Sequence, residues 1–166
     1  MILGMSTSTF TFVHLLLSLA AIGSGFFLVW GLLHNRRLDG WTAIFIVTSM
    51  LTSLTGFVFP FVQLRPSHVL GLSSLTMLTL AIFARIGFQL EGAWRGIYVV
   101  SISAALYFNC FAAVVQAFAK IPVLRGSPPS RSQPLFLIAQ GSVLAVFVIL
   151  TFLAAKRFRV SPVSSA

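Results

Sequence analysis

Five long apolar stretches, separated by short polar segments, constrain this chain more than any other feature of its sequence. A bilayer has a hydrocarbon core about 30 Å thick, which an α-helix crosses in about 20 residues. The sequence predicts five such helices, at 10–33, 41–61, 67–90, 96–119 and 134–155. We therefore expect an all-α transmembrane helical bundle that forms a single integral membrane domain over residues 1–166.

The ends of these stretches carry residues that stop or start helices. A polar segment from His34 to Gly40 closes the first stretch, and its terminal glycine is typical of a helix end. Pro60 marks the end of the second stretch, because an interior proline breaks the hydrogen-bond ladder of a helix. Ser67 is a suitable N-cap for the third helix, and Pro122 follows the fourth.

Composition and charge agree with a lipid environment. The chain is 58% hydrophobic and only 8% charged, which leaves too little polar surface for a soluble domain. Eleven Lys and Arg residues against two acids, Asp39 and Glu91, give a net charge of +9. In a soluble protein this imbalance would suggest nucleic acid, but here the cations are scattered over short loops and the tail. The expected partner is the lipid bilayer, and no nucleic acid is expected.

The distribution of cations predicts the orientation of the chain. Positive loops stay on the cytoplasmic side, and seven cations fall on one side of the predicted bundle, namely Arg36, Arg37, Arg85, Arg95, Lys156, Arg157 and Arg159. Four fall on the other side, namely Arg65, Lys120, Arg125 and Arg131. The three tryptophans, Trp30, Trp41 and Trp94, belong to the more positive side, where they would form an interfacial belt. The sequence therefore predicts an N-terminus outside and a C-terminus in the cytoplasm.

Two histidines could form a cofactor site. His14 lies about one turn inside the first helix and His68 begins the third, and both belong to the outer side because the chain crosses twice between them. Two imidazoles at similar depth could ligate a b-type haem, or a metal such as copper or zinc. The simpler alternative is that each is an interfacial hydrogen-bonding residue. His34 lies on the opposite side and cannot join them.

A second set of polar residues lies toward the same outer end. Asn109, Gln116 and Lys120 are spaced by seven and four residues, which places them on one face of the fourth helix. Gln140 lies about two turns into the fifth helix from the same side. Polar side chains in lipid are costly unless paired, so these four either form a ligand pocket with the histidines or bond the helices to one another.

Three further features concern packing. Arg85 and Gln89 form an i, i+4 pair near the end of the third helix, and Glu91 or Asp39 could neutralise Arg85, which we interpret as a snorkelling anchor. Ala21 and Gly25 form a small-xxx-small pair, which favours close helix packing. The lone Cys110, and the tyrosines Tyr98 and Tyr107, are expected to be packing residues.

Several functions lack the residues they require. The apolar stretches contain no Asp or Glu, which disfavours a pump that carries protons or sodium on a buried carboxylate. The first and fifth helices are apolar through their middles, which argues against a channel. The sequence contains no CxxC, HExxH or phosphate-binding glycine loop, so no catalytic residue is assigned and a non-enzymatic protein is favoured.

Two functional hypotheses follow. The first is a helper or small-ligand-binding subunit that works with membrane partner subunits or as a homo-oligomer. The second is a b-type haem or metal-binding electron-transfer protein with His14 and His68 as ligands.

The sequence resembles a group of small multi-pass proteins of the bacterial inner membrane. The residues that carry the resemblance are a histidine in the first helix, here His14, and a segment with Phe59 and Pro60 followed by Pro66, Ser67 and His68. The resemblance implies the number of helices and location in a bacterial inner membrane. It implies no activity.

Overall fold

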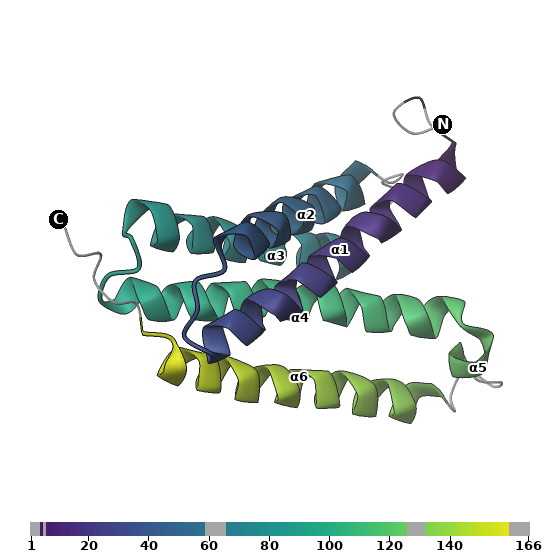
Figure 1. Ribbon diagram of the computed structural model, residues 1–166. Coiled ribbons are helices and arrows are strands. Elements are labelled where there is room, and N and C mark those ends of the chain that lie inside the picture. The colour runs from purple at the N-terminus through teal and green to yellow at the C-terminus, as the bar shows by residue number, and fades with distance from the viewer. Residues whose placement is uncertain (1–3, 5, 59–65, 126–131, 160–166) are drawn as a thin grey trace.

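Five long helices form an antiparallel bundle in the computed structural model of the protein (Figure 1). The structure describes residues 4, 6–58, 66–125 and 132–159. The long elements are α1 (Thr7–Leu33), α2 (Asp39–Val58), α3 (Pro66–Ile82) with its continuation η1 (Phe83–Gly87), α4 (Ala93–Lys120) and α6 (Ser132–Arg157). A single turn, α5 (Pro122–Arg125), follows α4. No strand occurs in the described ranges, and the prediction of an all-α bundle with five long apolar helices is confirmed.

The first helix begins and ends at specific capping residues. The Ser6 hydroxyl accepts a hydrogen bond from the Thr9 backbone N–H at 3.1 Å, so α1 starts at Thr7, three residues before the predicted position. At the other end Asn35 adopts φ 55°, and the Arg36 N–H donates to the Gly31 carbonyl at 2.8 Å. This is the Schellman arrangement, in which a residue in the left-handed region closes the helix.

The third helix departs most from its prediction. The sequence predicts a helix to Leu90, whereas the α-helix ends at Ile82 and continues as the π-helical turn η1. Gln89 and Leu90 then adopt φ values of 49° and 63°. The Leu90 N–H donates to the Ala84 carbonyl at 2.9 Å, and the Leu90 side chain is buried at 3% exposure. Burial of that side chain offsets the cost of its backbone conformation.

The starts of the other helices are also set locally. Pro66 is the first residue of α3, a position that proline favours because its missing N–H would have no partner there. Ser67, the predicted N-cap, therefore lies inside the first turn. The predicted end of the second helix at Pro60 lies outside the described residues.

The core is built around α4. Half of the residues in the most apolar stretch of α4 are buried, 50%, against 11% in α6. Gly25 allows α1 to approach closely, since a Cβ atom there would lie 2.5 Å from Leu106 and 2.8 Å from Phe45. Ala21, one turn earlier, is fully buried. The close packing predicted from the Ala21 and Gly25 spacing is confirmed.

The outside of the bundle is apolar. Large exposed side chains include Leu16 and Phe27 on α1, Val47 on α2 and Phe152 on α6. The five spans are long and apolar enough to cross a bilayer, and this surface suits lipid rather than water. The chain thus has the character of a multi-pass integral membrane protein.

The two ends of the bundle differ. The N-terminal end is where α1, α3 and α6 begin and where α2 and α4 end. The C-terminal end is the opposite one, where α1 and α6 end (Figure 1). Trp30, Trp41 and Trp94 all lie at the C-terminal end. There Trp41 stacks on Phe27 at 4.5 Å between ring centroids, and Trp94 stacks on Phe88 at 3.7 Å.

Candidate functional site

His14 is tied to α2 at the N-terminal end of the bundle. Its Nδ1 lies 2.8 Å from the Thr55 hydroxyl oxygen. That hydroxyl donates its own proton to the Leu51 carbonyl at 2.6 Å. With the Thr55 hydroxyl donating to Leu51, Nδ1 is the donor in the bond between His14 and Thr55.

His68 meets the same end of α2 from a different helix. It lies in the first turn of α3, is buried at 8% exposure, and packs against the ring of Phe57 at 5.6 Å between centroids. His14 and His68 therefore contact Thr55 and Phe57, which are two residues apart on α2, and side chains at i and i+2 do not share one face of a helix. No group of three or more His, Cys, Asp or Glu side chains lies together within the described ranges.

Asn109 and Gln140 form hydrogen bonds between helices. The Asn109 Nδ2 donates to the Ser49 hydroxyl of α2 at 3.0 Å, and both side chains are buried. The Gln140 Nε2 donates to the Phe111 carbonyl of α4 at 3.2 Å. The Gln140 Oε1, by contrast, is buried and accepts no hydrogen bond within the described part of the chain.

Gln116 and Lys120 occupy a different environment. Both side chains are exposed on the last two turns of α4. Lys120 is the last residue of α4 and His14 lies in the first third of α1, so both belong to the N-terminal end of the bundle. The structure thus places Asn109 and Gln140 inside the bundle, and Gln116 and Lys120 at its rim.

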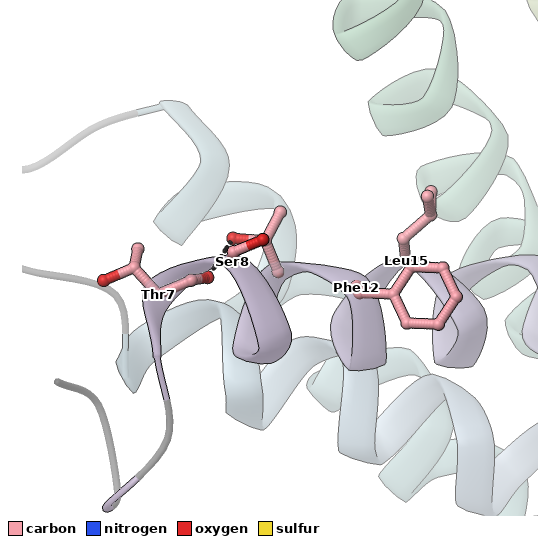
Figure 2. Close-up of a pocket in the computed structure, with 5 residues that line it drawn as sticks. Thr7, Ser8, Phe12 and Leu15 are labelled. Atoms are coloured by element: carbon pink, nitrogen blue, oxygen red, sulfur yellow. Dashed lines mark hydrogen bonds between the residues drawn. The ribbon is translucent and has the colours of Figure 1, made fainter.

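A shallow hollow of about 370 Å³ lies on the first turns of α1. Figure 2 shows Thr7, Ser8, Phe12 and Leu15 along one side of this helix. The Thr11 hydroxyl, which also lines the hollow, donates to the Thr7 carbonyl at 2.8 Å. The hollow adjoins the N-terminal end of the bundle. None of the six candidate site residues from the sequence lines it, namely His14, His68, Asn109, Gln116, Lys120 and Gln140.

No family model, curated protein or solved structure matches this chain. Assignment of its function therefore rests on the geometry of its own side chains.

A second polar cluster, at the C-terminal end, was only partly expected. Arg85 of η1 pairs with Asp39 of α2, one of the two acids proposed as its counter-ion; the other, Glu91, is exposed. Arg85 also donates to the Tyr98 hydroxyl at 3.1 Å and lies 3.4 Å from the Thr42 hydroxyl. The Arg85 side chain is only 16% exposed, so it is packed into the end of the bundle rather than extended into water like a simple snorkelling anchor.

The role of Tyr98 was missed by sequence reasoning. Its ring is buried at 1% exposure, and its hydroxyl lies 3.3 Å from that of Thr42. The available signal was that Thr42 directly follows Trp41 and that Tyr98 lies about one turn after Trp94, so both are near the end of the bundle that carries Arg85. Tyr107, by contrast, packs against Phe147 at 5.8 Å, and Cys110 is a free thiol against the core.

Proposed function

We propose that this protein is a non-enzymatic membrane subunit that binds a small amphipathic molecule at the N-terminal end of its bundle. The observation that carries the proposal is the Gln140 Oε1, a buried acceptor with no hydrogen-bond donor from the described residues. Such an atom costs about 1–3 kcal/mol when it is left unsatisfied. A hydroxyl or N–H group of a bound molecule would recover that energy.

The residue types support binding rather than catalysis. Asn109 and Gln140 carry amides, which orient a ligand through hydrogen bonds but do not transfer protons near neutral pH. The exposed residues Leu137 and Leu144 of α6 lie one turn on either side of Gln140. They offer an apolar surface for the rest of an amphipathic ligand, and Lys120 supplies positive charge at the rim.

The test uses protein purified in a mild detergent, with small molecules extracted into organic solvent and identified by mass spectrometry. We expect a molecule that co-purifies with the unaltered protein and is lost from Gln140→Leu. Gln133→Leu is the matched control, because Gln133 is exposed at the start of the same helix. Identical extracts from all three proteins would refute ligand binding at Gln140.

The alternative is a b-type haem or metal-binding electron carrier. Its support is that the His14 Nδ1 is hydrogen-bonded to the Thr55 hydroxyl, a bond of the kind that orients the ring of a haem- or metal-ligating histidine. Visible absorption spectra of the oxidised and reduced protein decide this alternative. Haem bands that vanish in His14→Ala and His68→Ala would establish it, and a colourless protein would remove haem.

We also propose that the protein resides in a bacterial inner membrane, with the N-terminal end of the bundle outside. The excess of cations on the segments of the C-terminal end supports this orientation. Helper activity would require membrane partner subunits or a second copy of this chain, and the sparsely buried α6 has apolar surface for such contacts.

A further inference from the structure

Two basic segments far apart in the sequence meet at the C-terminal end of the bundle. The backbone N–H of Arg159 donates to the Asn35 Oδ1 at 2.6 Å. Asn35 lies between α1 and α2, and Arg159 follows the last residue of α6. This bond joins two segments that together carry five cations, which we name the basic cluster: Arg36, Arg37, Lys156, Arg157 and Arg159.

Asn35 is suited to hold this junction. Its φ of 55° lies in the left-handed region, which asparagine tolerates better than most residues. That conformation closes α1 through the Schellman bonds, and the side chain then receives Arg159. Phe158, next to Arg159, is buried at 2% exposure and packs near Tyr98 at 6.2 Å between ring centroids. The segment that follows α6 is therefore anchored by one contact with the α1–α2 connection and by another with α4.

The acid closest in sequence does not neutralise the cluster. Asp39, two residues after Arg37, is paired with Arg85. Glu91 belongs to the separate connection between η1 and α4. Arg36, Arg37, Lys156, Arg157 and Arg159 are all exposed, so their charge is directed to the surroundings.

We propose that the basic cluster binds the phosphate groups of anionic phospholipids. The five cations lie within one or two turns of the ends of α1 and α6, both of which are long enough to cross the bilayer. They therefore lie at the level of lipid headgroups, where clustered Lys and Arg residues recognise anionic lipids. Lys156 lies next to the apolar surface of the bundle, because its Nζ is 4.3 Å from the ring centroid of the exposed Phe152. The positive-inside rule depends only on how many cations lie on each side of the membrane. The proposed lipid site depends in addition on the bond between Asn35 and Arg159, which joins the two basic segments.

The experiment measures lipid retention by native mass spectrometry. The full chain is placed in nanodiscs with equal amounts of phosphatidylglycerol and phosphatidylcholine, and lipids that remain bound after release are counted. We expect preferential retention of phosphatidylglycerol by the unaltered protein. Each Lys or Arg near a surface strengthens anionic-lipid binding by roughly fivefold, so Arg36→Gln with Arg37→Gln should reduce the preference by tenfold or more, about the product of two such factors.

Two further variants distinguish a localised lipid-binding site from a general effect of the positive charge of the protein. Arg125→Gln with Arg131→Gln removes the same charge from the connection between α4 and α6 and should leave the preference unchanged. Asn35→Gly keeps every charge and permits the same φ, but removes the acceptor for Arg159; it should give a smaller loss than the double arginine variant. Circular dichroism confirms that each variant is folded.

The outcomes are distinct. Loss of the preference only in the variants at Arg36, Arg37 and Asn35 supports the proposal. Equal retention of both lipids by the unaltered protein, or equal loss in the control at Arg125 and Arg131, overturns it. Full displacement of the lipid by millimolar inorganic phosphate also overturns it, because the site would then be one for free phosphate. None of these results depends on the ligand proposed at Gln140.

Discussion

The Tyr98 hydroxyl shows how the environment of a polar group decides what that group contributes. It bonds Arg85 of η1 and approaches Thr42 of α2, and its ring is almost fully buried. Asp39, which bonds the same arginine, is 70% exposed. Water screens the ion pair and competes for it, but it does not reach the tyrosine.

We predict that Tyr98→Phe costs more stability than Asp39→Asn. Loss of the hydroxyl removes a hydrogen bond to a charged group in a buried position, which costs about 1.5–3 kcal/mol. Loss of the exposed carboxylate charge should cost less than about 1 kcal/mol. The measurement is the free energy of unfolding in detergent for both variants. A larger effect of Asp39→Asn would mean that the ion pair, rather than the tyrosine, joins these helices.

The left-handed residues after η1 allow a second prediction. Gln89 is exposed at φ 49° and has no burial to offset this conformation, so Gln89→Gly should stabilise the protein by about 0.5–1 kcal/mol. Leu90 has a similar φ but a buried side chain. Leu90→Gly should therefore destabilise by about 2 kcal/mol or more. Thermal unfolding midpoints in detergent should move in opposite directions, and a shift of both in the same direction would contradict this explanation.

Some of these contacts could be predicted from the sequence and others could not. The pairing of Arg85 with Asp39 was one of two alternatives, because both acids flank the same end of the bundle. The hydrogen bonds that Arg85 donates to Tyr98 and Thr42 depend on where the π-helical turn η1 directs the guanidinium. No residue pattern in the sequence identifies a π-helical turn. Helical spacing placed Asn109 and Gln116 on one face of α4. Asn109 is buried and Gln116 is exposed, and this difference depends on how far the neighbouring helices extend beside α4.

At the scale of elements, apolar length identified all five long helices, since lipid requires about 20 residues of helix for each crossing. The helix ends were less accurate. Ser6, a cap outside the apolar stretch, extends α1 to Thr7, and α6 continues through its basic residues to Arg157. Hydropathy does not detect turns of this kind because they lie in the headgroup region.

The contact of α1 with α2 and α4 supplies a matched pair of variants. Gly25 faces Phe45 and Leu106, whereas a Cβ atom at Gly23 meets no atom within 4 Å. Gly25→Ile should force the helices apart and cost roughly 1–3 kcal/mol through overpacking. Gly23→Ile introduces the same side chain toward open space and should be close to neutral. Unfolding in detergent measures both, and similar losses at the two positions would refute the close approach.

At the scale of the whole molecule, five crossings would place the start of α1 and the end of α6 on opposite sides of a membrane. The predicted orientation can be tested with single cysteines in a Cys110→Ala background. Ser6→Cys should react with a membrane-impermeant maleimide in intact cells, whereas Glu91→Cys should react only after the inner membrane is permeabilised. The reverse pattern would place the N-terminal end in the cytoplasm.

The peripheral position of α6 bears on how the protein is made. Helix α6 contacts α4 and α1 and covers neither α2 nor α3 extensively, so α1 to α4 can pack against one another before α6 is synthesised. The bond between Asn35 and Arg159 joins the α1–α2 connection to the segment that follows α6, so it can form only after α6 has been made. The Asn35 to Arg159 junction is thereby confined to chains that include α6, and a chain truncated before residue 159 would lack it.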